Sequence, residues 1–200
     1  MFYSTDTNAH GLPHDPFKAI VSPRPIGWIG SRSARGRDNL APYSFFNAVS
    51  SVPPVVMFSS DHVKDSLRNI EETGVFTVNL ASRDLAEQMN ATSASLEHGE
   101  SEFEAAGLAS VTGKLVDAPY VGEAYAVLEC RLTGIMAPPT LEGAVTHSRM
   151  VFGQVVAIHI KDEALTGDGR LDMGKVRPLA RLGYRDYCDG GDVFEMVRPR

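Results

Sequence analysis

The sequence predicts a mainly β protein with short helices, arranged as an antiparallel barrel with helical insertions. About six segments have the alternating or apolar character of strands, and glycine and proline turn signals separate them. Only two or three short stretches have helical spacing. The strands do not alternate regularly with crossover helices, which argues against a doubly wound parallel sheet. These observations together favour a barrel.

The chain has 200 residues and a formal net charge of −6 at pH 7. This length favours one domain over residues 1–200, with an N-terminal arm over 1–18 and a C-terminal tail over 188–200. The mild acidity argues against a nucleic-acid partner, which would require a basic surface. There is no signal-peptide pattern and no apolar run near the roughly 20 residues of a membrane span. We therefore expect a cytoplasmic protein that does not associate with membranes.

Cysteine and histidine spacing predicts no metal site. Cys130 and Cys188 fit neither a metal-ligand pattern nor a disulfide framework, so both are expected to be free thiols. His10 and His14 are four residues apart, but a glycine and a proline lie between them and break the helix that would bring them together. A solvated arm is the better interpretation.

The first predicted strand covers residues 26–31 and follows two prolines that forbid a helix. Its glycines, Gly27 and Gly30, leave room for another segment to approach closely, or mark a bend. Residues 32–39, with Gly36 near the centre, are predicted to form the turn of an antiparallel hairpin.

Strands and helices alternate irregularly in the rest of this half. Gly74 is a natural helix stop, and Asp65 or Ser66 can cap the start of that helix. Ser101 and Glu104 match a capping box. The elements expected here are strand 55–58, helix 65–73, strand 75–80, helix 82–91 and a short helix ending near 107.

The second half is predicted to be β. Strands are expected over residues 111–116, 124–136 and 150–160, and a loop over 137–147. His147 and His159 lie near strand ends, where a satisfied structural histidine is more common than a catalytic one. The polar segment from residue 161 contains Arg181, whose surroundings leave open whether it contacts a phosphate or only solvent.

One stretch carries candidate binding chemistry. Ser59 and Ser60 end a strand, Lys64 follows, and a helix starts at Asp65 or Ser66. Hydroxyls, a lysine and a helix N-terminus together suit a phosphate. A serine-rich turn that only caps the helix is the alternative. Asp65, an awkward neighbour for a phosphate, suits a helix cap better.

The residues before this strand form a predicted aromatic loop over 41–47. Its backbone, with Ser44 and Asn47, offers hydrogen bonds to the edge of a flat ring, and its aromatic side chains offer packing surfaces. A loop that plugs the barrel is the alternative. The Rossmann fingerprint, the G-x-S-x-G elbow and the H-E-x-x-H motif are absent from the sequence.

The sequence resembles the flavin reductase-like family, which has an FMN-binding split barrel. The resemblance covers roughly residues 10–187, and its segments occur in the family's order. It is carried by 24–31 (RPIGWIGS), 39–50 (NLAPYSFFNAVS), 53–59 (PPVVMFS), 64–70 (KDSLRNI), 74–80 (GVFTVNL), 153–160 (GQVVAIHI) and 178–184 (PLARLGY). Tyr184 stands where the family often has a second glycine.

The resemblance implies a homodimer with FMN at the subunit interface, or FAD as the alternative flavin. It implies ring contacts from Ala41, Pro42, Tyr43, Ser44 and Asn47. It implies phosphate contacts from Ser59, Ser60, Lys64 and Ser66. Asp65 and Arg181 are further cofactor-binding candidates because of their positions in the sequence. It identifies no catalytic residue in this chain.

The function implied is that of an NAD(P)H-dependent flavin reductase that passes hydride to flavin N5. The reduced flavin would then serve a flavin-dependent monooxygenase or another electron acceptor. Two alternatives remain. One is an FMN-binding electron-transfer protein of the flavoredoxin type, which has no nicotinamide reaction. The other is a split-barrel module that binds a different ligand or none.

Overall fold

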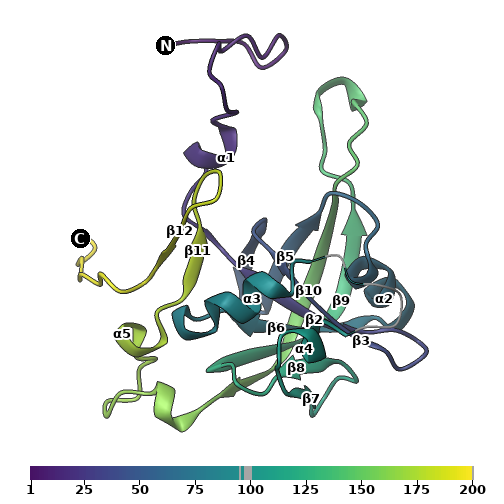
Figure 1. Cartoon of the computed structure of the whole chain (residues 1–200), viewed down its shortest axis with the longest axis vertical. Helices are drawn as coiled ribbons and strands as arrows, with labels where there is room; N and C mark the ends of the chain where they lie inside the picture. The colour runs from purple at the N-terminus through teal and green to yellow at the C-terminus, as the bar shows by residue number, and fades with distance from the viewer. Residues whose placement is uncertain (95, 97–100, 200) are drawn as a thin grey trace.

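The computed structural model describes residues 1–94, 96 and 101–199, and its centre is a curled antiparallel sheet of seven strands (Figure 1). In sheet order the strands are β3 (Asp38–Tyr43), β2 (Gly27–Arg32), β6 (Val75–Leu80), β9 (Ala126–Met136), β10 (Arg149–Ile160), β5 (Pro54–Ser60) and β4 (Phe46–Ser51). With short helices around this sheet, the predicted fold class, an antiparallel split barrel, is confirmed.

The barrel is split because its first and last strands are not hydrogen-bonded to each other. β3 and β4 lie at opposite edges of the sheet, although only Ser44 and Phe45 separate them in the chain. We call residues 43–46 the seam, since the chain passes here from one edge to the other. Side chains close the gap: a Cβ on Gly27 would lie 2.6 Å from the ring of Phe46.

Short helices and two small sheets surround the barrel. The helices are α1 (Phe17–Ile20), α2 (Asp65–Thr73), α3 (Ala86–Ala91), α4 (Glu102–Ala105) and α5 (Met173–Val176), with single 3₁₀ turns at Arg83–Leu85, Leu141–Gly143 and Asp162–Ala164. One small sheet pairs β1 (Arg24–Pro25), β11 (Leu179–Arg181) and β12 (Tyr187–Asp189), and the other pairs β7 (Ser110–Thr112) with β8 (Pro119–Val121). None of the helices among the described residues is long and apolar enough to cross a bilayer.

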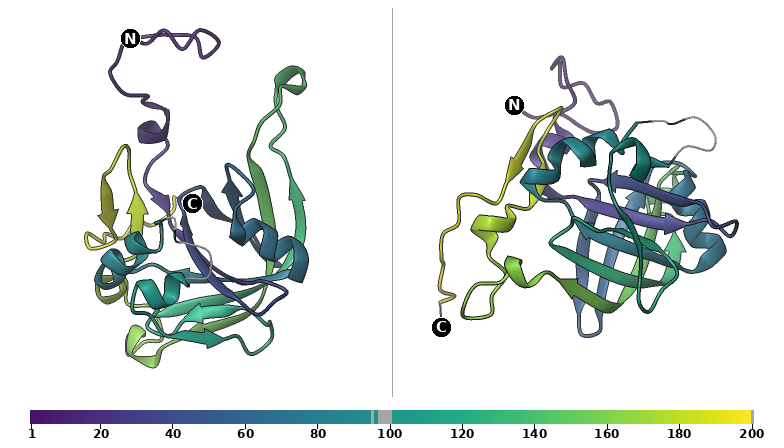
Figure 2. Two further views of the ribbon diagram at one scale, coloured as in Figure 1. Left: turned by 45° about the vertical axis from the view of Figure 1, so that its right-hand side comes forward. Right: turned by 60° about the horizontal axis from the view of Figure 1, so that its bottom comes forward.

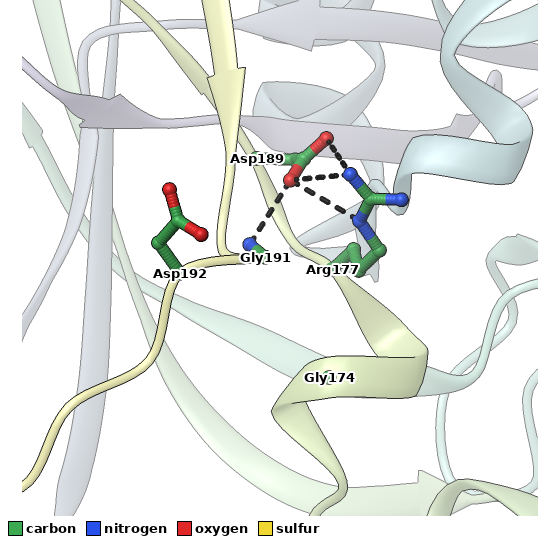
Figure 3. A pocket seen from close by; sticks show the side chains of 5 residues that line it. All are labelled: Gly174, Arg177, Asp189, Gly191 and Asp192. Atoms are coloured by element: carbon green, nitrogen blue, oxygen red, sulfur yellow. Dashed lines mark hydrogen bonds and ion pairs between the residues drawn. The ribbon is translucent and has the colours of Figure 1, made fainter.

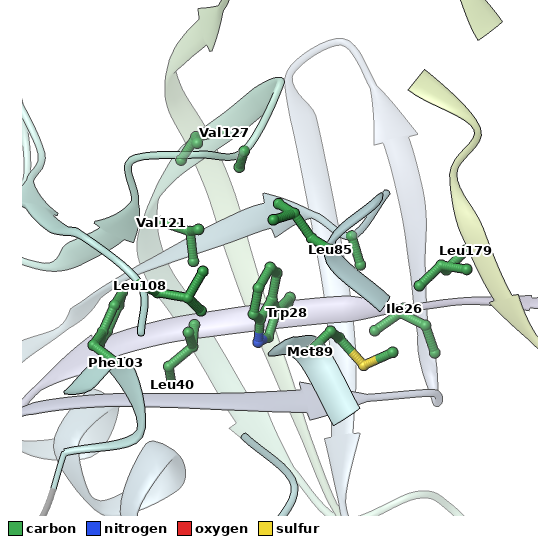
Figure 4. Close-up of a cluster of buried hydrophobic side chains, with 12 residues drawn as sticks. Ile26, Trp28, Leu40, Leu85, Met89, Phe103, Leu108, Val121, Val127 and Leu179 are labelled. Carbon is green, nitrogen blue, oxygen red and sulfur yellow. The ribbon is translucent and has the colours of Figure 1, made fainter. Parts of the chain in front are cut away.

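Two buried clusters lie on opposite faces of β2. Trp28 is fully buried in one cluster, which includes Met89 of α3 and Phe103 of α4 (Figure 4). Ile29 is fully buried in the other, with Leu67 and other residues of α2, β5 and β6. Because successive side chains of a strand point to opposite faces, β2 packs against helices on both of its faces. This packing holds α2 at the open edge of the barrel.

The predicted glycine roles agree with the structure. A Cβ on Gly30 would lie 2.1 Å from the carbonyl oxygen of Pro119, so β8 approaches β2 more closely than a side chain permits. Gly36 turns the β2–β3 hairpin with φ of 78°, and Gly74 ends α2 with φ of 73°. Both torsion angles lie in the left-handed region that favours glycine.

Several sequence predictions were wrong in detail. Residues 41–47 are not a loop but the end of β3, a two-residue turn and the start of β4. The predicted strand 111–116 is limited to β7. The N-cap of α2 is Lys64 and not Asp65 or Ser66. The predicted capping box makes no side-chain cap at α4; instead the Glu102 carboxylate accepts a hydrogen bond from the backbone N–H of Leu40, 3.2 Å away.

Candidate functional site

Tyr43 begins the seam, and its side chain is buried. Its hydroxyl oxygen is also buried and has no well-formed hydrogen bond, although the hydroxyls of Ser66 and Ser60 lie close to it. Burial raises the pKa of Tyr43, and these two hydroxyls act in the opposite direction. An unpaired buried hydroxyl is unfavourable. The structure therefore joins a residue of the predicted ring-binding segment to two residues of the predicted phosphate segment.

Ser59 and Ser60 end β5 beside the seam. The backbone N–H of Ser59 donates to the carbonyl of Phe45 over 2.8 Å, so it is already used. Ser60 is 1% exposed, and its hydroxyl donates to the carbonyl of His62 over 2.7 Å. The hydroxyl of partly exposed Ser59 is thus more accessible to a ligand than that of Ser60.

Ser66 attaches α2 to the sheet. Its hydroxyl accepts a hydrogen bond from the Asn39 amide over 2.9 Å. Asn39 also donates to the hydroxyl of Ser31 over 3.3 Å, and Asn69 of α2 donates to the same oxygen over 3.2 Å. All four side chains are buried. This network holds the first turn of α2 in a defined position against β2 and β3.

The N-terminus of α2 is open. Lys64 is exposed at the N-cap position, and no side chain among the described residues caps the helix. The first backbone N–H groups of a helix have no partner within the helix and carry partial positive charge. Asp65 pairs with Arg68 over 2.7 Å, which offsets its negative charge. This end of α2 therefore presents N–H groups and an ammonium group to an anion.

Arg149 is a cation at this site that the sequence reasoning missed. It begins β10 and lies directly opposite Ser60 in the β10–β5 register. Its guanidinium donates to the carbonyls of Ser148 and Thr146, over 3.0 and 3.3 Å. In the described part of the chain it has no carboxylate partner, so its charge is not neutralised by an ion pair. Only the strand register, which is not local in sequence, reveals this neighbour.

The other residues predicted to contact the flavin ring lie on the seam and on the adjoining strands β3 and β4. Ala41 and Pro42 are half-buried on β3, opposite Ile29 and Trp28. Ser44 is half-buried in the turn. Asn47 is exposed on β4, where its amide oxygen accepts the N–H of Ala48 over 2.9 Å. Thus the predicted binding residues between 41 and 66 lie on the seam and on the strands and helix that adjoin it.

Arg181 lies apart from this region. It belongs to β11, on the opposite side of the barrel from α2 (Figures 1 and 2). Two cavities lie on that side. One, of about 620 Å³, is lined by residues of α3 and the β11–β12 hairpin, and the other, of about 300 Å³, adjoins Arg177 and Asp189 (Figure 3). Neither is lined by the seam or by the start of α2.

His159 has the structural role that its position suggested. Its Nε2 lies 2.5 Å from Oε1 of Glu129, a fully buried carboxylate, and its ring packs against Tyr120. His147 is exposed, and its ring centroid lies 5.7 Å from that of His62 in the loop after β5. Cys130 is buried and Cys188 half-buried, and both are free thiols.

The site as a whole suits a phosphate bound to a larger flat group. Lys64 and the open end of α2 supply donors at the surface, and Arg149 lies opposite Ser60 in the sheet. Ser59 alternates with Ser60 along β5, so its side chain lies on the other face of the sheet from Ser60 and Arg149. The seam continues from this region toward Asn47. Ser60 and Ser66 are buried beneath this surface. They reach an anion only if it displaces their present hydrogen bonds; otherwise they support the groups above them.

Comparisons with known proteins place the chain in a family. A family model described as "Flavin reductase like domain" matches residues 21–184. An uncharacterized protein of Aquifex aeolicus is 36% identical over 173 residues, covering 84% of this chain and 85% of that protein. The uncharacterized protein YwrF of Bacillus subtilis is 33% identical over 193 residues, covering 92% of this chain and 94% of that protein.

Solved structures share the fold over almost the whole chain. The 2-nitrobenzoate 2-nitroreductase NbaA of Pseudomonas fluorescens superposes with a TM-score of 0.85 at 29% identity, covering 100% of this chain and 96% of that one. Component B of nitrilotriacetate monooxygenase from Bacillus cereus gives 0.86 at 28%, covering 98% of both chains. Flavoredoxin of Desulfovibrio vulgaris gives 0.76 at 25%, covering 100% and 97%.

Proposed function

This chain belongs to the flavin reductase-like family, and from that premise we propose that it is an FMN-binding oxidoreductase that takes hydride from NAD(P)H. The observation that carries the proposal is the junction at the seam. There the Tyr43 hydroxyl lies beside Ser60 and Ser66, Ser66 belongs to the first turn of the uncapped α2 that follows the exposed Lys64, and Arg149 lies opposite Ser60 in the sheet. This set of donors fits the phosphate of a flavin nucleotide.

The residues present fit FMN in two parts. Lys64, Arg149 and the first N–H groups of α2 would hold the phosphate, with Ser60 and Ser66 beneath them. The seam and its flanking strands, from Ala41 to Asn47, would contact the ring. FAD is the alternative flavin, since the outer side of this site is open.

A homodimer is part of the proposal. A single chain leaves the ring-binding strand β4 uncovered: Val49 is 50% exposed and Val52, just beyond it, is 90% exposed. A second copy over this surface would bury these apolar side chains and one face of the ring.

FMN, when bound, would supply the redox chemistry, because the flavin accepts hydride at N5 without help from a protein acid or base. The task of this chain is then to bind and orient. The charges of Lys64 and Arg149 fix the phosphate end. The rigid Asn39–Ser66 network fixes α2, and the β3–β4 connection fixes the ring end. Transfer of the electrons to a monooxygenase or another acceptor is the last step proposed.

Electron transfer without a nicotinamide reaction is the second candidate function. The likeness to Desulfovibrio vulgaris flavoredoxin favours it, since that structure covers the whole chain at 25% identity. The likeness to nitrilotriacetate monooxygenase component B, at 28% identity, favours the reductase and the monooxygenase partner.

One experiment separates these functions. The protein is purified, supplied with FMN or FAD, and mixed anaerobically with NADH or NADPH while the visible absorbance of oxidised flavin is followed. Catalytic bleaching is the expected result and identifies the nicotinamide used. Flavin that binds but is not bleached supports the electron-transfer protein. Failure to bind either flavin contradicts both functions.

A further inference from the structure

We propose that the cavity beside the C-terminal hairpin binds the phosphate of a nucleotide, at a place distinct from the seam and α2. This cavity, the arginine cavity, has a volume of about 620 Å³ and lies between α3 and β11–β12. Arg83, Arg181 and Arg185 line it, together with one carboxylate, Asp189. Three guanidinium groups around one space are notable in a chain whose net charge is −6.

The single carboxylate does not neutralise these arginines. Both oxygens of Asp189 accept hydrogen bonds from Arg177, over 2.9 to 3.2 Å, and the N–H of Gly191 adds a further bond of 3.0 Å (Figure 3). Arg83 reaches Asp189 only at 3.7 Å. Because Arg177 already matches the charge of Asp189, the wall formed by Arg83, Arg181 and Arg185 keeps an excess of positive charge.

Arg181 is held in place by neutral groups. Its guanidinium donates to the hydroxyl of Tyr187 and to the carbonyl of Tyr184, and it lies 4.5 Å from the centroid of the Tyr187 ring. No ion pair joins Arg181 or Arg185 to a carboxylate within the described ranges. An arginine that is oriented but not neutralised is well suited to bind an incoming anion.

A fourth arginine, Arg24, adds positive charge next to Arg181. Arg24 of β1 lies directly opposite Arg181 of β11. Burial, and then the charge of Arg181, lower the pKa of Arg24. Like charges opposite each other across a strand pair are unfavourable. An anion beside Arg181 would offset this repulsion.

The remainder of the cavity indicates the rest of the ligand. Met89 and Leu179 are almost fully buried and give it an apolar floor, and the half-exposed ring of Tyr187 lies at its side. The volume is within the usual range for small-molecule sites, roughly 300–1,000 Å³. A phosphate with a flat ring attached matches both the charged rim and the apolar floor. A flavin mononucleotide and a nicotinamide nucleotide share this chemistry.

Calorimetric titration of the FMN-saturated protein with ADP, 2′,5′-ADP and inorganic phosphate tests the proposal. These probes undergo no redox reaction, so the result is independent of the reductase activity. We expect the nucleotides to bind and the R83A/R185A variant to bind them at least about tenfold more weakly, through loss of charge-assisted hydrogen bonds. Both side chains are exposed, so the variant should fold; its unfolding midpoint checks this. R35A, at the exposed β2–β3 turn, is the matched control and should bind as the wild type does.

A second titration, of the FMN-free protein and the same double variant with FMN, identifies the source of the phosphate. Weaker FMN binding in the variant assigns the cavity to the flavin phosphate and contradicts the phosphate site proposed at Lys64 and α2. Unchanged FMN binding with loss of ADP affinity assigns it to a nicotinamide nucleotide. If R83A/R185A binds FMN, ADP and 2′,5′-ADP as tightly as the wild type, the proposal is wrong. It is also wrong if inorganic phosphate binds as tightly as the nucleotides.

Discussion

Buried Glu129 and partly exposed His159 form a pair across β9 and β10, with Nε2 of His159 lying 2.5 Å from Oε1 of Glu129. Glu129 is fully buried and also accepts the backbone N–H groups of residues 114, 115 and 116, over 2.6 to 2.9 Å. One carboxylate thus holds the turn between β7 and β8 against the sheet. Both carboxylate oxygens of Glu129 are therefore hydrogen-bonded, and these bonds offset the cost of burying its negative charge.

Replacing Glu129 with glutamine should destabilise the protein by about 2–4 kcal/mol, because an amide NH₂ would then face donors instead of accepting from them. Urea unfolding at neutral pH measures the loss. E87Q, on the exposed surface of α3, is the control and should change the unfolding free energy little. A loss in E129Q no larger than in E87Q would contradict the stabilising role of this carboxylate.

The same pair predicts a pH dependence of stability. Burial alone would raise the pKa of Glu129, but hydrogen bonds from His159 and from the turn outweigh it and lower the pKa below the ordinary 4.5. A carboxylate with a lowered pKa stabilises the fold above its unfolded-state pKa, and this stabilisation is lost as pH falls through the folded-state pKa. The difference in unfolding free energy between wild type and E129Q should therefore be constant above about pH 5 and shrink in more acidic solution. A difference that instead grows as pH falls would reverse the assigned direction of the shift.

Replacing Lys64 with alanine should weaken FMN binding by on the order of 1–3 kcal/mol, the loss of one charge-assisted contact. Quenching of flavin fluorescence during titration gives the affinity. K114A, with an exposed side chain in the turn after β7, should bind FMN as the wild type does. Equal affinities of K64A and the wild type would remove Lys64 from the proposed phosphate site.

Tyr43 carries a buried hydroxyl without a hydrogen bond, so its removal should cost the FMN-free protein nothing. We expect Y43F to be as stable as the wild type or up to about 1 kcal/mol more stable. Y43L is the contrasting variant, because it loses the ring that packs 4.7 Å from Phe58, and it should be less stable. Thermal unfolding of both variants without flavin makes the comparison. A clear loss of stability in Y43F would show that the hydroxyl is satisfied after all.

Gly30 is a position where any side chain should disturb the fold. The Cβ of G30A would lie 2.1 Å from the carbonyl oxygen of Pro119 and 2.5 Å from Oγ1 of Thr77, so we expect a loss of about 2 kcal/mol or more. Gly134 is the matched control, because a Cβ there has open space and its φ is not in the left-handed region. Chemical denaturation should separate G30A from G134A. Equal stabilities would mean that β8 can move away from β2 at little cost.

The parts of the fold that local rules control could be predicted from the sequence. The long strands β9 and β10 have the expected alternation, Gly36 marks the hairpin turn, and Gly74 marks the end of α2. Local rules failed at the seam. Pro42 and the polar residues around it suggested a loop, but pairing of β3 with β2 and of β4 with β5 overrides this tendency.

The candidate site was predictable only where its residues are close in sequence. Residues 59–66 could be grouped as one unit because a single turn joins β5 to α2. Arg149 could not be included, because only the β10–β5 register brings it opposite Ser60. The position of Arg181 far from α2 could not be predicted either, because it depends on the pairing of β11 with β1 and β12.

The split in the barrel also determines where another chain can add a strand. On the β3 edge, α2 and α4 cover the strand, and the Glu102 carboxylate occupies the N–H of Leu40. The β4 edge has exposed Ala48 and Val49, and the short strand β1 contacts it. Unpaired edges are the usual starting points of intermolecular sheet growth. Sheet extension by a single chain would therefore start at the β4 edge, and the second copy in the proposed homodimer would block it.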